Sequence, residues 1–269
     1  MKDILTEIVH NKRIEVERQK KAVDLPTLIA MGHESLERKT RSMREALAGS
    51  PSGIIAEFKR KSPSKGWFYP EADVASVVPE YERAGASACS ILTDGDYFGG
   101  SLRDLQRARN VVQLPLLRKD FIIDPYQVYQ ARIMGADAIL LIAAVLERDE
   151  ALELSQTAHA LGLEVLLEVH DERELDWLNP SVDMLGVNNR HLGTFHTDVE
   201  NSFRLAGQMA GVTRSTGYAP LMVSESGLSD WETVARLRQI GFRGFLIGEA
   251  FMKTKQPGNS LSGFIGGGV

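Results

Sequence analysis

The feature that most restricts the fold of this chain is a repeat that begins near residue 54, in which short apolar runs alternate with amphipathic segments. The eight runs end about 27 residues apart on average, which is the spacing of a strand–helix unit. Alternating strands and helices form a parallel sheet covered by helices. The predicted strands are 54–58, 88–93, 115–118, 138–143, 164–169, 184–187, 220–224 and 244–248.

A closed barrel and an open doubly wound sheet both satisfy this alternation. An open sheet usually carries a glycine-rich phosphate turn after its first strand, whereas the first strand here runs into the charged stretch 57–61. Eight units also close a barrel, and 269 residues suit a fold that typically takes about 250. We therefore predict an α/β fold, a (β/α)8 TIM barrel, as a single domain over residues 1–269.

Residues 1–50 precede the repeat and are predicted to form an N-terminal helical extension. Apolar residues at positions 4, 5, 8 and 9 indicate an amphipathic helix, and a second helix is predicted over 36–47. The extension could cap the barrel or lie over the substrate as a lid, and the sequence favours neither. The barrel core is expected over 51–256, followed by a C-terminal segment, 257–269, whose glycine-rich end from residue 263 we expect to fray.

Composition limits the partners and the compartment. A net charge of -5 and a pI near 5.8 argue against nucleic acid. The single cysteine, Cys89, lies in an apolar run and is expected to be a buried thiol, not a nucleophile. No apolar signal region opens the chain, and its longest apolar run, 138–146, is far short of the ~20 residues of a membrane span. We expect a cytoplasmic protein without membrane partners.

Known cofactor and metal motifs are not found in the sequence. The six histidines form no His-Glu-x-x-His run and accompany no cysteine pair, so we expect no zinc site. Neither a Walker loop nor a G-x-G-x-x-G fingerprint occurs. The sequence therefore predicts neither a metal nor an organic cofactor.

Polar residues follow several of the predicted strands. Barrel enzymes place their chemistry at the carboxyl ends of the strands, where side chains two residues apart share a face. That parity brings together Glu57, Lys59, Lys119, Phe121, Glu168, Asn188 and Arg190. Such a group could be a structural ring of ion pairs, but its gathering at one end favours general acid–base chemistry.

Three further segments predict an anion site. The runs 223–227 and 246–250 follow the last two strands, where barrels often bind phosphate through backbone N–H groups. The basic loop 59–66 follows the first strand and would attract an anionic substrate. The predicted substrate-binding residues in these segments are Lys61, Ser62, Glu225, Ser226, Gly227, Gly248 and Glu249.

Five ordered motifs give the chain a resemblance to the indole-3-glycerol-phosphate synthase family of tryptophan biosynthesis. They are IAEFKRKSPSKG at 55–66, TDGDYFGGSL at 93–102, LRKDFIIDPYQ at 117–127, GVNNR at 186–190 and SESG at 224–227. The resemblance implies a carboxy-lyase that closes the ring of 1-(2-carboxyphenylamino)-1-deoxyribulose 5-phosphate. Its product is indole-3-glycerol phosphate, with release of CO2 and water and without a cofactor. Two positions depart from the pattern, His191 and Gly95, and neither is a predicted catalytic residue.

The resemblance also implies roles for individual residues. Lys119 would protonate the ketone during condensation, and Glu168 with the Glu57–Lys59 pair would serve the dehydration, in a division that the sequence leaves open. Asn188 and Arg190 would orient the substrate, and Phe121 would pack against its aryl ring. The phosphate would be held by Lys59, Ser226, Gly227, Gly248 and Glu249.

Two other functions fit a phosphate-binding barrel. A phosphoribosylanthranilate isomerase would need a Cys–Asp pair at strand ends, but Cys89 lies inside a strand and Lys119 would have no role. A barrel that only binds a phosphorylated ligand or a partner protein would not need Glu57, Lys119 and Glu168 together. We expect a small phosphorylated substrate and a monomer or a weak homo-oligomer.

Overall fold

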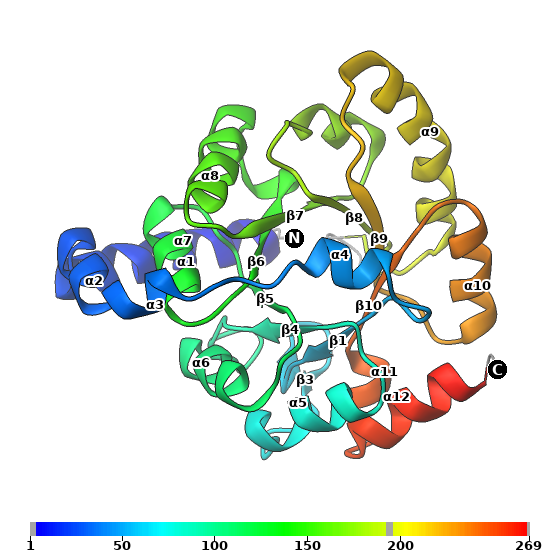
Figure 1. Ribbon diagram of the computed structural model, residues 1–269, viewed down its shortest axis with the longest axis horizontal. Helices are drawn as coiled ribbons and strands as arrows, with labels where there is room; N and C mark the ends of the chain where they lie inside the picture. Colours follow the sequence, from blue (N-terminus) through cyan, green and yellow to red (C-terminus); the bar gives the residue numbers. More distant parts are fainter. Residues whose placement is uncertain (1–3, 192–195, 268–269) are drawn as a thin grey trace.

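The computed structural model describes residues 4–191 and 196–267, so the first three residues and the last two of the predicted terminal segments lie outside it. Eight parallel strands form a closed barrel in the order β1-β10-β9-β8-β7-β6-β5-β4 (Figure 1). The predicted barrel is therefore confirmed over the open sheet. The strands are β1 Ile54–Phe58, β4 Ala88–Leu92, β5 Leu116–Lys119, β6 Ala138–Ile142, β7 Glu164–Val169, β8 Met184–Asn188, β9 Leu221–Glu225 and β10 Gly244–Ile247.

The observed strand limits differ from the predicted ones by at most one residue at either end. β5 begins at Leu116 and β9 at Leu221, one residue after Pro115 and Pro220. Proline has no N–H to donate to a neighbouring strand, which explains both late starts. Parallel pairing around the barrel, such as Glu168 opposite Gly186, brings the carboxyl ends of all eight strands to one rim.

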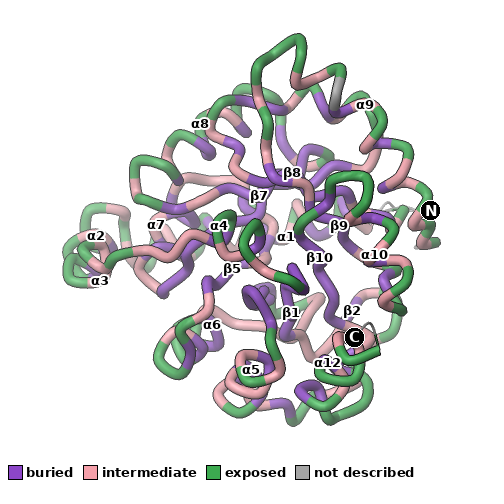
Figure 2. The backbone as a smooth tube through the Cα atoms, turned by 45° about the vertical axis from the view of Figure 1, so that its right-hand side comes forward, coloured by how far each residue is buried: buried purple, intermediate pink, exposed green. Residues whose placement is uncertain are grey.

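Helices surround the barrel and cover its outer face (Figures 1 and 2). Between β7 and β8 the connection is a 3-10 helix, η2, and not an α-helix. The helices are α1 Ile4–Ala22, α2 Leu25–Met31, α3 His33–Glu37, α4 Met43–Ala48, α5 Val74–Arg83, α6 Leu102–Val111, α7 Pro125–Ile133, η1 Ala143–Val145, α8 Arg148–Ala160, η2 Glu172–Trp177, α9 Glu200–Thr216, α10 Trp231–Gln239, α11 Glu249–Met252 and α12 Pro257–Gly266. The basic loop after β1 contains a short hairpin, β2 Lys61–Ser62 with β3 Gly66–Trp67.

The predicted helix over 36–47 is wrong, because the chain between α3 and α4 is not helical. Arg132 of α7 donates hydrogen bonds to the carbonyls of Ser35 and Leu36 at the end of α3. Ser42 then caps α4 by accepting from the backbone N–H of Glu45. Contacts with the barrel thus use the backbone groups that a continuous helix would have paired internally.

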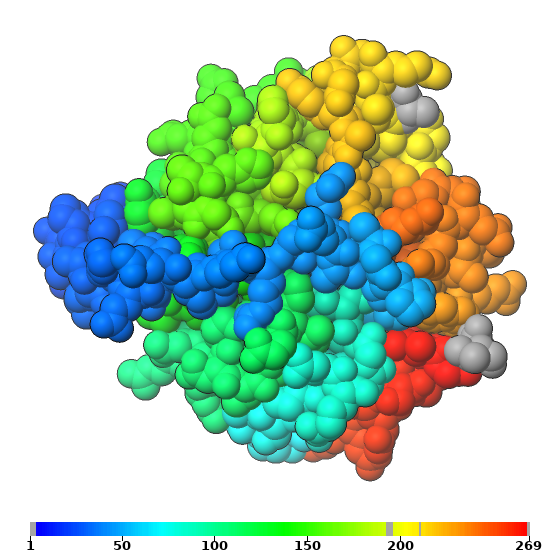
Figure 3. Space-filling model, viewed as in Figure 1, coloured from blue at the N-terminus to red at the C-terminus, as the bar shows by residue number. Residues whose placement is uncertain are grey.

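The N-terminal extension covers both ends of the barrel. Residues 38–50 cross the amino-terminal end (Figure 3), where Met43 and Leu47 of α4 pack inside the barrel against Ile55 and Leu117. At the carboxyl end, Ile4, Leu5 and Ile8 of α1 line a cavity. The extension is therefore a plug at one end, and part of the cavity wall at the other.

The C-terminal segment is ordered by packing. Leu261 of α12 is fully buried, and the ring of Phe264 lies 5.7 Å from that of Phe251 and 6.2 Å from that of Trp231. The expected fraying is wrong for residues 263–266, which belong to this helix. Apolar contacts compensate for the conformational entropy that its glycines lose on folding.

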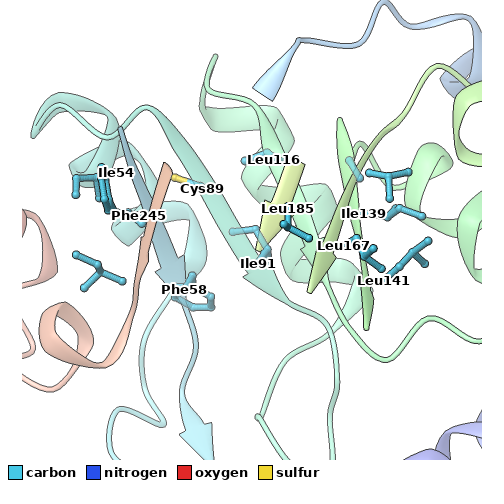
Figure 4. Close-up of a cluster of buried hydrophobic side chains, with 14 of the residues drawn as sticks. Ile54, Phe58, Cys89, Ile91, Leu116, Ile139, Leu141, Leu167, Leu185 and Phe245 are labelled. Atoms are coloured by element: carbon cyan, nitrogen blue, oxygen red, sulfur yellow. The ribbon is translucent and has the colours of Figure 1, made fainter. Parts of the chain in front are cut away.

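Apolar residues form one cluster outside the barrel and another inside. The outer cluster lies between the strands and the helices and contains Cys89 (Figure 4), whose predicted burial is confirmed. Burial raises the pKa of this thiol, so it is not a nucleophile at neutral pH. The inner cluster fills the barrel from α4 up to the cavity floor. In the part of the chain that the structure describes, no helix is both long and apolar enough to cross a membrane.

Candidate active site

A cavity of about 510 Å³ opens at the carboxyl ends of the strands, a volume suited to a small ligand. Inner-cluster residues such as Ile55 and Leu117 form the layer below it, and the next residues of the same parity on these two strands, Glu57 and Lys119, line the cavity. The structure gathers nearly all predicted site residues there: Glu57, Lys59, Ser62, Lys119, Phe121, Glu168, Asn188, Arg190, Glu225, Ser226, Gly227, Gly248 and Glu249.

Lys119, at the end of β5, lies among carboxylates. Its Nζ is 3.5 Å from Oε2 of Glu168 and 3.5 Å from Oε2 of Glu225. Burial disfavours its charge, yet these carboxylates and that of Glu57 raise the pKa of Lys119. Lys119 is therefore an ammonium group at neutral pH and carries a proton into the cavity.

Two glutamates beside Lys119 have opposite pKa shifts. Burial opposes ionisation of Glu168, but Lys119 and His170 prevail and lower its pKa. Burial raises the pKa of Glu225, and repulsion from Glu168 and Glu57 adds to this effect against the attraction of Lys119. Glu168 is thus held as a carboxylate, while Glu225 takes up a proton more easily. Groups whose environments push their pKa values apart can divide acid and base roles.

Glu225 occupies space that only glycine at position 186 leaves open. A Cβ added to Gly186 would lie 2.2 Å from Oε1 of Glu225. Among residues 4–191 and 196–267, this buried oxygen has no hydrogen-bond partner. We predicted Glu225 as a substrate-binding residue, and its place beside Lys119 makes it a candidate catalytic group as well. Glu225 comes two residues after Val223, which faces the inside of the barrel, and this spacing in the sequence indicates that Glu225 faces inward as well.

Glu57 and Lys59 form an ion pair at the end of β1, with Nζ 2.6 Å from Oε1. A Cβ added to Gly248 would lie 2.4 Å from the same oxygen. We expected Gly248 to let the backbone approach an anion, and the structure adds a second reason for glycine there. It leaves room for the side chain of Glu57.

Asn188 and Arg190 are connected at the end of β8. The Nδ2 of Asn188 donates to Oε1 of Glu168 at 3.1 Å, and its Oδ1 accepts from the backbone N–H of Arg190 at 3.0 Å. The guanidinium of Arg190 donates to Oγ of Ser64 and lies 3.7 Å from Oε2 of Glu249. Glu249 also pairs with Lys65, which links the basic loop to the end of β10.

Near β9 and β10, the rim of the cavity offers both backbone groups and positively charged side chains. Ser226 adopts a left-handed conformation, with φ 69°, that is uncommon for a residue with a side chain. Asn189 holds this loop by donating to the carbonyl of Ser226 and to Oγ of Ser224. Lys59, Lys65, Arg190 and Lys253 line the same cavity, so an anion there would meet several cations.

Lys61 is the one predicted site residue that does not line the cavity. Its Nζ donates to the carbonyl of Asp96 and lies 5.6 Å from the centre of the Trp67 ring. The β2–β3 hairpin turns alternate residues of the loop in different directions, which the sequence pattern did not reveal. Lys65, which we had not chosen, lies in the cavity wall.

An apolar wall faces the charged groups across the cavity. The ring centre of Phe121 lies 6.2 Å from that of Phe98, and Leu140 and Ile142 add aliphatic surface. Ile4, Leu5 and Ile8 of α1 complete this wall. The cavity can therefore hold a ligand with an apolar ring at one end and an anionic group at the other.

A buried lysine of α1 fixes this helix to the rim. Lys12 Nζ lies 3.0 Å from Oδ2 of Asp94 and 3.0 Å from Oδ1 of Asp120, which follow β4 and β5. Burial opposes its charge, but both carboxylates raise the pKa of Lys12. We missed Lys12, although it interrupts the apolar stripe that includes Ile8 and Val16, a visible sign of a buried charge.

His170 was also missed. It follows β7, two residues after Glu168, and its ring nitrogens face Glu168 and Glu174. Parity along the strand would have placed it near Glu168. Within the described residues, no group of three or more His, Cys, Asp or Glu side chains could hold a metal ion.

A closed (β/α)8 barrel with mixed charge, an apolar wall and a cationic rim defines the class of barrel enzymes that act on phosphorylated small molecules. Comparison with known proteins gives the particular family. The family model for indole-3-glycerol phosphate synthase matches residues 5–263, and this chain belongs to that family. It is 58% identical to the indole-3-glycerol phosphate synthase of Bacteroides thetaiotaomicron over 267 residues, covering 98% of each chain.

Other relatives agree at greater distance. The indole-3-glycerol phosphate synthase of Magnetococcus marinus is 43% identical over 272 residues, again covering 98% of both chains. Among solved structures, the tryptophan synthase alpha subunit of Legionella pneumophila matches with a TM-score of 0.59 and 15% identity, over 82% of this chain and 96% of that one. At that identity the likeness supports the fold alone.

Proposed function

We propose that this enzyme closes the ring of 1-(2-carboxyphenylamino)-1-deoxyribulose 5-phosphate to give indole-3-glycerol phosphate in tryptophan biosynthesis. The observation that carries this proposal is the position of Lys119, a buried ammonium group within 3.5 Å of Glu168 and Glu225. Family membership supplies the substrate, and the cavity has the matching charges and apolar wall.

The substrate would lie across the cavity with its charged ends apart. The phosphate would meet Lys59 and the backbone of Ser226, Gly227 and Gly248, where a helix also begins. The aryl ring would pack on Phe121 and the neighbouring aliphatic side chains. Arg190 and Asn188 would orient the polar groups between them. A substrate held at both ends brings its reacting carbons together, which lowers the entropic part of the barrier.

Lys119 would act as the general acid of the condensation. The aryl carbon that bears the carboxylate attacks the ketone carbon, and the new C–C bond leaves charge on the ketone oxygen. Lys119 donates its proton to that oxygen, which becomes a hydroxyl group. The carboxylate then leaves as CO2, and the electrons of its bond restore the aromatic ring.

Dehydration would follow at the same carbon. The hydroxyl leaves as water after it receives a proton, and a proton is lost from the neighbouring carbon to form the indole double bond. Glu168, held as a carboxylate, suits the base, and the Glu57–Lys59 pair or Lys119 suits the acid. Glu225, whose pKa is raised, would be a second group that can bind the proton removed from the substrate.

The test is a fluorescence assay for indole-3-glycerol phosphate with the carboxyphenylamino substrate. The wild-type enzyme should form the product, and Lys119→Ala should lose about 10²–10⁴-fold or more in kcat with an unchanged circular dichroism spectrum. A matched control, Lys61→Ala, should keep most of kcat because Lys61 faces Asp96. No product at high enzyme concentration would instead favour a binding protein or another barrel enzyme.

The remaining proposals concern the compartment, domain organisation, cofactor requirement and oligomeric state of the enzyme. We propose that it works in the cytoplasm, as a single barrel domain, on a small-molecule substrate and without a cofactor. A monomer or a weak homo-oligomer stays a prediction, which sedimentation of the purified protein would test.

A further inference from the structure

We propose that His170 is a positioning residue for the reaction, a cation that fixes the carboxylate of Glu168 from behind the cavity. This inference rests on the proposed function. His170 does not line the cavity and is not expected to touch substrate. Its effect would pass entirely through Glu168.

The two oxygens of Glu168 have different neighbours. Oε1 accepts from Nδ2 of Asn188 at 3.1 Å and lies 3.3 Å from Nε2 of His170. Oε2 lies 3.5 Å from Nζ of Lys119. A hydrogen bond from Asn188 thus holds one oxygen, and His170, whose ring nitrogens make no hydrogen bond among the described residues, acts on the same oxygen through its charge at 3.3 Å. The other oxygen is left directed at Lys119. Rotation of the carboxylate would break the contacts on both sides.

His170 is itself held on three sides. Its side chain is 12% exposed, and its Nδ1 lies 3.4 Å from Oε2 of Glu174 in η2. The same carboxylate accepts from the backbone N–H of His170 at 2.6 Å, and Asn201 of α9 donates to its carbonyl at 3.0 Å. The imidazole therefore has little freedom to turn away from Glu168.

The carboxylates of Glu168 and Glu174 favour the charged form of the His170 imidazole. A neutral imidazole has one N–H, so one nitrogen would present a lone pair to a carboxylate, whereas an imidazolium carries an N–H on both nitrogens and is attracted to both carboxylates. Burial opposes this charge, but Glu168 and Glu174 raise the pKa of His170 to about 10. The cation also attracts the carboxylates of Glu168 and Glu225, to which Lys119 supplies the other nearby positive charge.

The first experiment compares the pH profiles of kcat for wild type and His170→Gln in the product assay. Glutamine keeps a hydrogen-bond donor without the charge. We expect kcat to fall at least about tenfold with KM within about threefold, and the acidic limb to move up by roughly one pH unit or more. His159→Gln is the matched control, because His159 pairs with Asp183 at the other end of the barrel. Its profile should equal that of wild type.

A second variant leaves His170 in place. Glu174→Gln removes one of its two carboxylates, so the pKa of His170 should fall toward its ordinary value of about 6.5. Turnover of this variant should then decrease more steeply than that of wild type as pH rises from 6 to 9, because His170 loses its charge in this range only in the variant. NMR titration of the His170 ring, in the absence of substrate, should give a pKa above 8 in wild type.

The outcomes separate the inference from the proposed function. Wild type without product would refute the proposed function, whatever the variants do. An active wild type with His170→Gln unchanged in kcat and pH profile would overturn the role of His170, even if the variant unfolds at lower urea. A His170 pKa near 6.5 in the NMR titration would overturn it as well.

Discussion

Substitution of Lys12 by methionine tests how the N-terminal helix is held to the barrel. Lys12 is 2% exposed and has two carboxylates at 3.0 Å, those of Asp94 and Asp120. At an effective dielectric constant of about 20, each contact represents about 5.5 kcal/mol of Coulomb attraction, which desolvation of the three ions largely offsets. Methionine keeps the length of the side chain and removes the charge.

The expected loss comes from the carboxylates that remain. Removing one partner of a buried ion pair typically costs about 3–5 kcal/mol, because a buried charge is left uncompensated. Asp120 retains Arg118 at 3.0 Å, and its Oδ2 also accepts from Thr93, so we expect the lower half of that range. For a chain of this size, 3 kcal/mol corresponds to a decrease in Tm of about 6–12 °C.

Equilibrium unfolding in urea, followed by circular dichroism, measures this effect. The matched control is Lys20→Met on the same helix, whose ion pair with Asp124 is 2.9 Å long but 38% exposed at the lysine, so its loss should be at most about 1 kcal/mol. The difference between Lys12→Met and wild type should also shrink as pH falls below about 4. Burial alone would raise the pKa of Asp120, but Arg118 and Lys12 lower it below that of the unfolded chain. The ionised Asp120 therefore stabilises the fold at pH values above its unfolded pKa, and this stabilisation is lost as pH falls toward the folded pKa.

Equal free energies of unfolding for Lys12→Met and Lys20→Met would refute this reasoning. A loss in free energy of unfolding of Lys12→Met that is the same at pH 7 and pH 3 would also refute it, because a packing defect does not depend on pH. A decrease in the free energy of unfolding that is found in Lys12→Met but not in Lys20→Met, and that becomes smaller as pH falls below about 4, would support the buried ion cluster as the anchor of α1.

Three other predictions concern the cavity. Gly248→Ala should displace Glu57 and lower kcat at least about tenfold, because its Cβ would lie 2.4 Å from Oε1, and wild-type turnover would contradict that packing. Inorganic phosphate should compete with substrate by raising KM without changing kcat, and noncompetitive inhibition would count against the anion site at β9 and β10. Glu225→Gln should raise Tm at pH 8 but not at pH 4.5. Folding raises the pKa of Glu225, so the wild type loses stability as pH rises above about 4.3, and an equal Tm at both pH values would contradict the shift.

The barrel and the central charged residues Glu57, Lys119 and Glu168 of the cavity could be predicted from the sequence, because both follow from local patterns. Apolar runs of strand length at regular spacing define the (β/α)8 order, and parity along a strand decides which side chains face inward. Glu57, Lys119 and Glu168 follow inward-facing apolar residues, and the structure brings them together at one rim.

Tertiary structure decided what depends on contacts between distant segments. The break between α3 and α4 comes from hydrogen bonds to Arg132, and the order of α12 comes from Phe251 and Trp231. The direction of Lys61 depends on the β2–β3 hairpin. No local pattern contains these partners.

The same distinction applies inside the site. The sequence by itself determined which residue types meet at the rim, because a strand of known parity has only two faces. Tertiary structure decided their charges and exact neighbours: Glu225 over Gly186, His170 behind Glu168, and Lys12 between two aspartates. A pKa depends on distances of a few ångströms and on burial, and both are set only when the barrel closes.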